Sequence, residues 1–107
     1  MLANSSALDL ATTRVLAIVE QIPRGKVATY KQIAQLAQLK NPRHVGRILR
    51  ISPLAAKYPC HRVVRSNGTL AEGNLFGEEY GQLKKLRAEG ILFEGGRVKL
   101  NKYQWSA

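Results

Sequence analysis

The chain has 107 residues, of which 45% are hydrophobic, and a formal net charge of +10 at pH 7. This length suits a single domain, which we expect to span residues 1–107. The sequence has neither an apolar run of about 18 residues nor a basic N-terminal segment followed by an apolar one, which excludes a membrane-spanning helix and a secretion signal. Its only cysteine, Cys60, cannot form an internal disulfide, so we expect a free thiol in a cytoplasmic protein.

The positive charge is unevenly distributed. Residues 21–71 contain no aspartate or glutamate. The same segment contains ten cationic residues: Arg24, Lys26, Lys31, Lys40, Arg43, Arg47, Arg50, Lys57, Arg62 and Arg65. A surface with one sign of charge attracts a polyanion, so we expect nucleic acid as a partner. The alternative is a solvated basic surface that serves only solubility.

The first predicted element is an amphipathic helix over residues 8–22, with Ser6 as its N-cap and with Pro23 and Gly25 ending it. A short connector or strand follows at residues 27–30. Thr29 can then cap a helix over residues 30–38. The inward-facing residues of this second helix are predicted to be Ile33, Leu36 and Ala37.

Residues 42–51 predict a helix that begins at a proline and has two distinct faces. One face is predicted to pack and contains Val45, Ile48, Leu49 and Ser52. The opposite face presents Arg43, Arg47 and Arg50 at i, i+4 and i+7. Two short helices joined by a tight turn, the second with an arginine face, are typical of a helix-turn-helix. An ordinary solvated helix is the alternative, although three like charges at this spacing repel one another.

The rest of the chain predicts shorter elements. Pro53 ends the preceding helix, residues 54–59 form a loop, residues 63–64 are strand-like, and residues 66–68 form a turn. After an irregular loop at residues 72–77, a helix is predicted to begin between Phe76 and Glu78 and to reach Ala88. Its inward residues are predicted to be Tyr80, Leu83 and Leu86, and Gly90 occupies the position of a C′ glycine.

A β-hairpin is predicted from residues 91–93 and 97–100, joined through Gly95 and Gly96. We therefore predict a mostly α-helical fold with a small β-hairpin, similar to a winged helix-turn-helix domain.

Cys60 is followed directly by His61 and Arg62. A thiolate is a strong nucleophile, and neighbouring cations or imidazoles favour its formation. In an extended chain, however, His61 can reach the sulfur only through a turn or a water molecule. A buried structural cysteine is the alternative. We expect no metal, because one cysteine and two histidines, His44 and His61, do not supply four well-spaced ligands.

Four segments together carry a family resemblance. They are Ile22-Pro-Arg-Gly-Lys-Val-Ala-Thr-Tyr30, Arg43-His-Val-Gly46, Pro59-Cys-His-Arg-Val63 and Glu89-Gly90. In this order they resemble the DNA-binding, active-site domain of the O6-alkylguanine-DNA alkyltransferases, also called methylated-DNA–protein-cysteine methyltransferases. The resemblance extends over about residues 13–92.

The resemblance implies a role for each matching residue. Cys60 would accept the alkyl group, His61 would favour its thiolate through a water molecule, and Glu89 would orient His61. Arg43 would enter the duplex in place of the flipped guanine, and Tyr30 would press on the rotating phosphate. The arginine-faced helix would lie in the minor groove. The residues expected to bind DNA are Tyr30, Arg43, Gly46, Arg47, Arg50 and Arg62.

Four features depart from this family. The chain has no room for the extra N-terminal domain of full-length members, and its length and the tail at residues 102–105 look more like the alkyltransferase-like proteins. Those proteins bind alkylated guanine without repairing it and typically have Trp or Ala at the position of Cys60. Ser52 replaces a usual asparagine, and His44 and Arg47 stand where small residues are usual. The loop at residues 71–77 also differs, so the size of the alkyl group that fits is open.

Three functions are therefore considered. The first is an enzyme, a DNA repair methyltransferase that flips O6-alkylguanine out of double-stranded DNA and transfers its alkyl group irreversibly to Cys60, with no cofactor. The second is a non-enzymatic, alkyltransferase-like sensor that flips the same lesion and recruits nucleotide excision repair proteins. The third is a plain helix-turn-helix protein with an incidental thiol. We expect the protein to act as a DNA-associated monomer without membrane contact.

Overall fold

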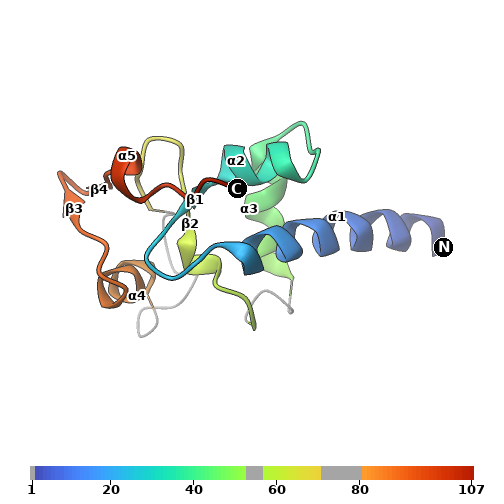
Figure 1. The fold of residues 1–107 in the computed structure, drawn as a ribbon. Helices are drawn as coiled ribbons and strands as arrows, with labels where there is room; N and C mark the ends of the chain where they lie inside the picture. Colours follow the sequence, from blue (N-terminus) through green and yellow to red (C-terminus); the bar gives the residue numbers. More distant parts are fainter. Residues whose placement is uncertain (1, 53–56, 71–80) are drawn as a thin grey trace.

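The computed structural model describes residues 2–52, 57–70 and 81–107. The molecule is elongated, with principal extents of 46 × 28 × 20 Å. Its first helix, α1 (Leu2–Gln21), projects away from the body that the other elements form (Figure 1). In the described ranges the chain is mostly helical with small sheets, which confirms the predicted fold class.

Helix α1 forms as its apolar spacing predicted, but it begins earlier. Val15, Val19 and Ile22 are fully or almost fully buried. Because the helix starts at Leu2, Ser6 lies within it and the predicted N-cap at Ser6 is wrong. The predicted end is confirmed: the helix stops at Gln21, and Gly25 adopts a φ of +87° in the turn that follows.

Helices α2 (Tyr30–Leu36) and α3 (Pro42–Ile51) form the predicted helix-turn-helix pair. Thr29 caps α2 as expected, with its side chain accepting from the Gln32 N–H while the Gln32 side chain accepts from the Thr29 N–H. Asn41 caps α3 by accepting from the backbone of Arg43 at 2.9 Å. Each cap satisfies backbone donors at a helix start and thereby fixes where the two helices begin.

The predicted inward position of Leu36 is wrong, because 44% of this residue is exposed. Gln38 adopts a left-handed φ of 60° just after α2, and the chain turns back there. Leu39 then packs against the core that also contains Ile33 and Ala37. After the turn Leu39 therefore packs inward, whereas Leu36, the last residue of α2, does not.

A two-stranded parallel sheet connects segments far apart in the sequence. Strand β1 (Ala28–Thr29) pairs with β2 (Val63–Val64), with Ala28 opposite Val63. The C-terminal segment adds a bridge on Val27: the Trp105 N–H donates to the Val27 carbonyl at 2.7 Å. The strand-like character of Val63 and Val64 was predicted, whereas the parallel pairing was not.

The C-terminal part contains α4 (Gln82–Ala88), β3 (Phe93–Glu94), β4 (Arg97–Val98) and α5 (Leu100–Tyr103). The β3–β4 hairpin confirms the prediction, and both of its turn glycines have positive φ angles. Gly90, with a φ of +86°, follows α4 as expected. Helix α5 was not predicted, since its first residue was assigned to the hairpin.

Two details of the prediction for α4 are wrong. Gly81 is the non-helical N-cap, so a helix does not run continuously from residues 76–78 to Ala88. Leu83 was expected to point inward, but 40% of it is exposed, whereas Leu86 is fully buried as predicted. The predictions for the loops at 54–56 and 72–77, for the start of the helix at 76–78 and for Tyr80 lie outside the described residues.

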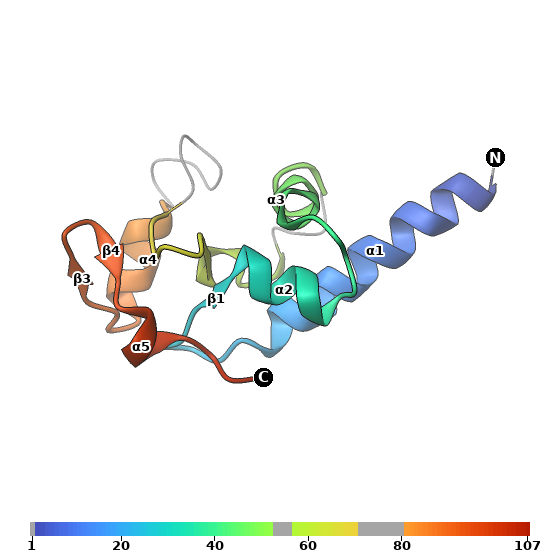
Figure 2. The same cartoon turned by 90° about the horizontal axis from the view of Figure 1, so that it is seen from above.

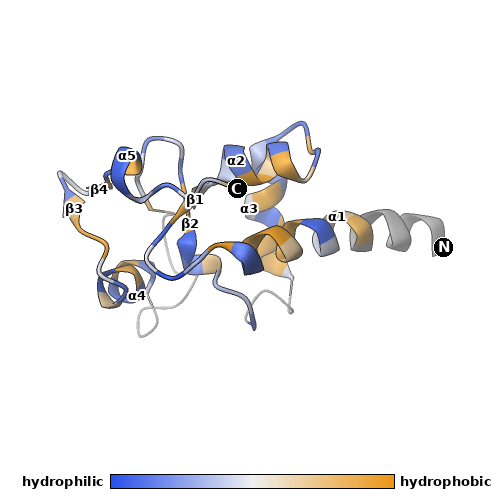
Figure 3. Cartoon of the chain, viewed as in Figure 1, coloured by the Kyte–Doolittle hydropathy of each residue, from blue (hydrophilic) through white to orange (hydrophobic). Residues whose placement is uncertain are grey.

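The buried residues form two clusters on either side of the small sheet. The first includes Ala28 and Val63 and joins α1, α2 and α3, whose hydrophobic residues gather where the three helices meet (Figure 3). The second includes Val27 and Val64 and joins α4, the hairpin and α5. Figure 2 shows α4, β3, β4 and α5 on one side of β1 and α3 on the other. The segment that contains Cys60 enters this sheet directly, so the site lies at the junction of both halves.

Candidate active site and nucleic-acid interface

Cys60 begins a single turn of 3-10 helix, η2 (Cys60–Arg62), immediately before β2. The turn closes through hydrogen bonds from the Arg62 N–H to the Pro59 carbonyl, at 3.0 Å, and from the Val63 N–H to the Cys60 carbonyl. Only 3% of Cys60 is exposed, and it packs in the cluster formed with α1, α2 and α3. The sheet therefore fixes the thiol close to the helix-turn-helix pair.

The thiol is protonated at neutral pH in the DNA-free protein. Burial raises the pKa of Cys60 to about 11, and the positive charge of Lys85 opposes this rise without overcoming it. This differs from a cysteine whose thiolate is already abundant before substrate binds. A reaction at Cys60 must therefore include loss of the thiol proton.

His61 and Arg62 are both bound by Glu89, the residue that follows α4. His61 Nε2 lies 2.6 Å from Glu89 Oε2, and Arg62 Nη2 donates to the same oxygen at 2.9 Å. Arg62 Nε and the Gly25 N–H donate to Glu89 Oε1 at 3.0 and 3.1 Å. The carboxylate thus connects three distant segments of the chain and leaves His61 in one fixed orientation.

The pKa values of Glu89 and His61 are both lowered, but for different reasons. Burial alone would raise the pKa of Glu89, but the hydrogen bonds from Arg62, His61 and Gly25 outweigh it and lower that pKa to about 2. Burial lowers the pKa of His61, although Glu89 opposes this effect. At neutral pH the pair therefore consists of a carboxylate and a neutral imidazole, which can accept a proton.

Arg62, which was expected to bind DNA, forms its hydrogen bonds within the protein. Its Nε and Nη2 atoms donate to Glu89, and its Nη1 donates to the Ile22 carbonyl at 2.8 Å. Only 15% of its side chain is exposed. These contacts hold the end of α1 against η2, so the role that the structure supports for Arg62 is to position the site.

Gln82 is a residue of the site that the sequence reasoning missed. Its buried carboxamide donates from Nε2 to the carbonyls of His61, at 2.9 Å, and Val63, at 2.7 Å. This contact fixes the turn that presents Cys60. A glutamine at the start of a short helix gives no signal in the sequence, because the two carbonyls that it binds are about 20 residues away.

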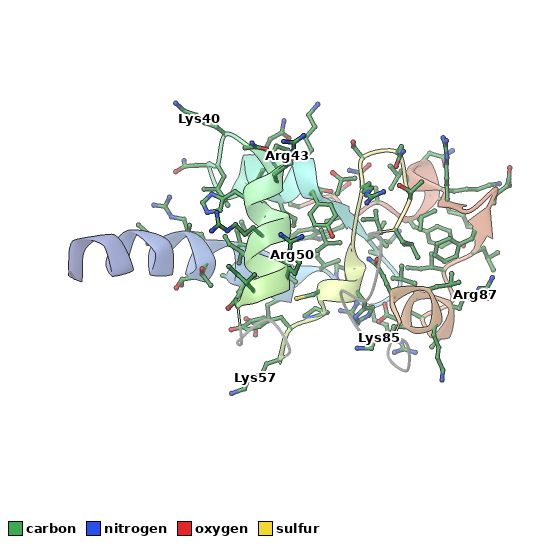
Figure 4. All side chains as sticks on the ribbon, turned by 180° about the vertical axis from the view of Figure 1, so that it is seen from behind. Lys40, Arg43, Arg50, Lys57, Lys85 and Arg87 are labelled. Carbon is green, nitrogen blue, oxygen red and sulfur yellow. The ribbon has the colours of Figure 1, made fainter. Side chains whose placement is uncertain are left out.

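The three predicted arginines lie on one exposed face of α3. Arg43, Arg47 and Arg50 are exposed, whereas Val45, Ile48 and Leu49 on the other face are buried. In Figure 4, Lys40 and Arg43 lie at the start of α3, Arg50 lies further along it, and Lys57 lies beyond its C-terminal end. The predicted two-faced helix is confirmed, and its outer surface is cationic over its whole length.

Tyr30 lies next to Gly46 of α3 and packs against the cluster that contains Cys60. An added Cβ on Gly46 of α3 would lie 3.7 Å from Tyr30 Cε1, so the ring covers the helix at its glycine. Burial raises the pKa of Tyr30, and the charges of Arg65 and Arg50 oppose the shift, while the Cys60 thiolate would add to it. Tyr30 is therefore a neutral phenol that lies among the arginine face, Arg65 and Cys60.

Within the described ranges, no group of three or more metal-binding side chains lies close enough together to hold a metal ion. None of the helices in these ranges combines the length and the apolar character that crossing a membrane requires.

Comparison with known proteins places these features in a family. A model described as the DNA-binding domain of 6-O-methylguanine DNA methyltransferase matches residues 11–91. The DNA base-flipping protein of Vibrio parahaemolyticus is 40% identical over 92% of this chain and 98% of its own length. A methylated-DNA–protein-cysteine methyltransferase of Methanothermobacter thermautotrophicus is 41% identical over 77% of this chain, but over only 45% of its own length.

The fold has a close counterpart among solved structures. Atl1 of S. pombe, in complex with damaged DNA containing O6-carboxymethylguanine, superposes with a TM-score of 0.81 and 30% identity. The match covers 92% of this chain and 97% of that protein, which confirms the helix-turn-helix-like fold. Because the family model matches residues 11–91 and the Vibrio relative aligns with 92% of the chain, the chain belongs to the family of the 6-O-methylguanine DNA methyltransferase DNA-binding domain.

Proposed function

We propose that this protein recognises O6-alkylguanine in double-stranded DNA by turning the damaged base out of the stack. Two kinds of observation support the proposal: the exposed arginine face of α3, and relatives that are named for base flipping or were solved on damaged DNA. A base inside a duplex cannot be reached by a protein pocket, so an enzyme or sensor of this lesion must extrude it, at a cost of a few kcal/mol.

The exposed residues of the helix-turn-helix would carry this step. Arg43, at the first turn of α3, would occupy the space that the extruded guanine leaves. Arg47 and Arg50, on the same face, would bind phosphates, and Gly46 would let the backbone approach the groove closely. Tyr30 lies between this face and Cys60, where it would contact the phosphate of the extruded nucleotide.

We further propose that Cys60 accepts the alkyl group from the flipped base. The sulfur would attack the alkyl carbon, forming an S–C bond while the O6–C bond breaks and its electron pair remains on the guanine oxygen. As the sulfur attacks, the thiol proton passes through a water molecule to the neutral imidazole of His61. The released guanine takes up one proton from water, and His61 returns its proton to the solvent, so the reaction gains or loses no net proton. The reaction consumes one protein molecule per lesion, because a thioether is not hydrolysed under ordinary conditions.

The observation that carries this proposal is the arrangement around the thiol. Cys60 begins the same turn as His61, and His61 is bound by Glu89 at 2.6 Å, beside the arginine-faced helix. A neutral histidine oriented by a carboxylate is the arrangement that general-base catalysis requires. A merely structural cysteine needs no such neighbours.

Two observations favour a second function, that of a sensor without alkyl transfer. The pKa of Cys60 is about 11 in the DNA-free protein, so only a small fraction of thiolate exists at neutral pH. Relatives that cover nearly the same length are named as base-flipping or alkyltransferase-like proteins. In that case the protein would bind the lesion as a monomer and recruit nucleotide excision repair proteins.

Equilibrium competition between two otherwise identical duplexes tests lesion recognition, which both functions share. The protein should bind the duplex with one O6-methylguanine more tightly than the duplex with guanine, using Cys60→Ala so that no reaction disturbs the equilibrium. Equal affinity for the two duplexes would show that the protein is a general DNA-binding domain.

A further inference from the structure

The C-terminal segment, residues 104–107, returns from α5 to the helix-turn-helix. In Figure 1 it runs from α5 back past β1 toward α2. The Val27 N–H donates to the Tyr103 carbonyl at 2.9 Å, and the Trp105 N–H donates to the Val27 carbonyl at 2.7 Å. Both backbone groups of Val27, the residue just before β1, therefore hold this segment in place.

Gln32 joins the C-terminal segment to the first turn of α2. Its Nε2 donates to the Trp105 carbonyl at 2.6 Å, and its Oε1 accepts from Gln104 Nε2 at 3.0 Å. The same Oε1 accepts from the Thr29 N–H at 3.3 Å, while the Gln32 N–H donates to Thr29 Oγ1 at 3.0 Å. One carboxamide therefore closes the capping box of α2 and also binds the C-terminal segment.

The capping box alone does not require an amide at this position. It needs an acceptor for the N–H of the capping residue, and glutamate serves as well as glutamine. A carboxylate in the first turn would also gain from the positive end of the helix dipole. Glutamine differs by its N–H donor, and in Gln32 this donor binds the Trp105 carbonyl.

The first turn of α2 carries Tyr30, which directly follows the capping residue Thr29. Tyr30 and Trp105 both pack against the first buried cluster, and the Tyr30 ring lies next to Gly46 of α3. The backbone of this turn determines where the Tyr30 side chain begins. Contacts that fix the turn therefore also fix Tyr30 relative to the arginine-faced helix.

We propose that the C-terminal segment positions Tyr30 for DNA binding, through the Gln32 carboxamide that joins this segment to α2. The inference rests on the proposed contact between Tyr30 and the phosphate of the extruded nucleotide. Gln32 is then a positioning residue that acts through Tyr30. Because the turn is ordered before DNA arrives, less conformational entropy is lost on binding.

The substitution Gln32→Glu separates the two roles of this side chain. Glutamate keeps the acceptor for the Thr29 N–H, so the capping box remains. Its second oxygen would face the Trp105 carbonyl with no proton between them, which disfavours the contact with the C-terminal segment. Gln35→Glu is the matched control, because it makes the same change of charge one turn further along α2, at an exposed residue.

Two measurements test the inference without DNA. Trp105 is the only tryptophan of the chain, so its fluorescence reports on the C-terminal segment. Gln32→Glu should increase the quenching of this fluorescence by acrylamide, and should speed amide hydrogen exchange in residues 28–33 by about three- to tenfold. Gln35→Glu should change neither. An unchanged value in either measurement for Gln32→Glu would overturn the inference.

Equilibrium competition on DNA tests whether Gln32 acts through Tyr30. With Cys60→Ala as the parent, Gln32→Glu should weaken binding to the O6-methylguanine duplex by about three- to tenfold. Gln35→Glu should weaken it by at most about twofold. When Tyr30→Phe is also present, Gln32→Glu should cost less than about twofold, because the hydroxyl group that it positions is gone.

Two results on DNA would contradict the inference. An equal loss from Gln32→Glu with Tyr30 and with Tyr30→Phe would show that Gln32 acts independently of this residue. An equal loss from Gln32→Glu and Gln35→Glu would show that the added negative charge is the cause.

Failure of the inference can be told apart from failure of the proposed function. If the Cys60→Ala parent binds the O6-methylguanine and guanine duplexes equally, the proposed lesion recognition is wrong. Quenching and hydrogen exchange then still decide whether the C-terminal segment holds the first turn of α2. If the parent prefers the lesion and Gln32→Glu keeps its full affinity, the proposed function stands and the inference is wrong.

Discussion

Glu89 accepts most of the hydrogen bonds that hold the residues around Cys60. Its carboxylate binds Arg62, His61 and the Gly25 N–H, and only 5% of its side chain is exposed. These donors come from the turn after α1 and from η2, while Glu89 itself follows α4. Loss of this one charge should therefore loosen several elements at once.

We expect Glu89→Gln to lower the free energy of unfolding at pH 7 by about 2–3 kcal/mol, because it leaves the Arg62 guanidinium largely buried without its anion. Urea unfolding measures the change. Glu94→Gln is a matched control, since Glu94 forms an exposed ion pair with Lys99 at 2.8 Å. The control should leave the midpoint almost unchanged, and equal effects of the two substitutions would contradict the role assigned to Glu89.

The lowered pKa of Glu89 also makes the stability of the folded protein depend on pH. The pKa of Glu89 is about 2 in the folded protein and lies near 4.5 when it is unperturbed. The unfolded chain therefore binds a proton first as pH falls, so stability should decline between about pH 5 and pH 2. His61 acts in the same direction, because its folded pKa is also lowered. Glu89→Gln should show a shallower decline over this range, and an unchanged profile would exclude Glu89 as its cause.

Arg43 is the residue expected to stabilise the flipped state. It is exposed at the first turn of α3, on the face that Arg47 and Arg50 continue. We expect Arg43→Ala to weaken binding to O6-methylguanine duplex by about tenfold more than binding to undamaged duplex, as measured by fluorescence anisotropy. Arg47→Ala is the control and should weaken both by a similar factor. Equal losses for Arg43→Ala would reduce this residue to a phosphate contact.

Among individual residues, the sequence predicted the site residues that belong to a motif. It missed those whose role depends on tertiary contacts. Cys60, His61 and Glu89 were expected together from a family resemblance, and the structure brings His61 and Glu89 into contact. Gln82 binds η2 from the first residue of α4, a position that the sequence analysis placed inside a longer helix, so its inward direction was not recognised. The contact of Arg62 with Glu89 likewise joins residues 27 positions apart, which no local pattern reveals.

Among the helices and strands, α3 supplies the positive charge that the proposed DNA binding requires. Its three exposed arginines belong to a segment, residues 21–71, that contains no carboxylate side chain. No intramolecular acid within this segment can neutralise them, so DNA phosphates are the counterions that fit. The helix is fixed to the core by Val45, Ile48 and Leu49, which lets it present the charges rigidly.

We expect DNA affinity to fall steeply with salt, with a log–log slope of about −4 to −6 if five or six phosphates are neutralised. Titrations at several salt concentrations measure the slope. Arg47→Ala and Arg50→Ala should each make it less steep by about 1, and Lys84→Met should not change it. A salt-independent affinity would contradict an interface built from these arginines.

The helices that could be predicted from the sequence are those whose apolar residues recur over several turns. The apolar spacing in α1 and α3 extends over several turns, and the predictions for both were confirmed apart from the start of α1. Strands β1 and β2 have two residues each and pair across 35 positions, so no local pattern could reveal their partnership. The turn η2 also depends on tertiary contacts, including those from Gln82.

In the whole molecule, the small parallel sheet joins the two buried clusters, which have different proposed roles. One half contains the helix-turn-helix that would bind DNA, and the other contains α4, which orients the thiol turn. Ala28 and Val63 pack into the first cluster, whereas their neighbours Val27 and Val64 pack into the second. The proposed base extrusion and alkyl transfer would therefore occur at the junction of the two clusters.

The intact mass of the protein after incubation with duplex DNA containing O6-methylguanine tests the central claim most directly. The account predicts a gain of one methyl group per molecule, located on Cys60 by peptide mapping, with no further turnover. Cys60→Ser should gain no methyl group, and His61→Ala should gain it more slowly, because the proton acceptor is lost. If the wild type binds the lesion selectively and its mass does not change, the claim of alkyl transfer is contradicted and the protein is a sensor of the lesion.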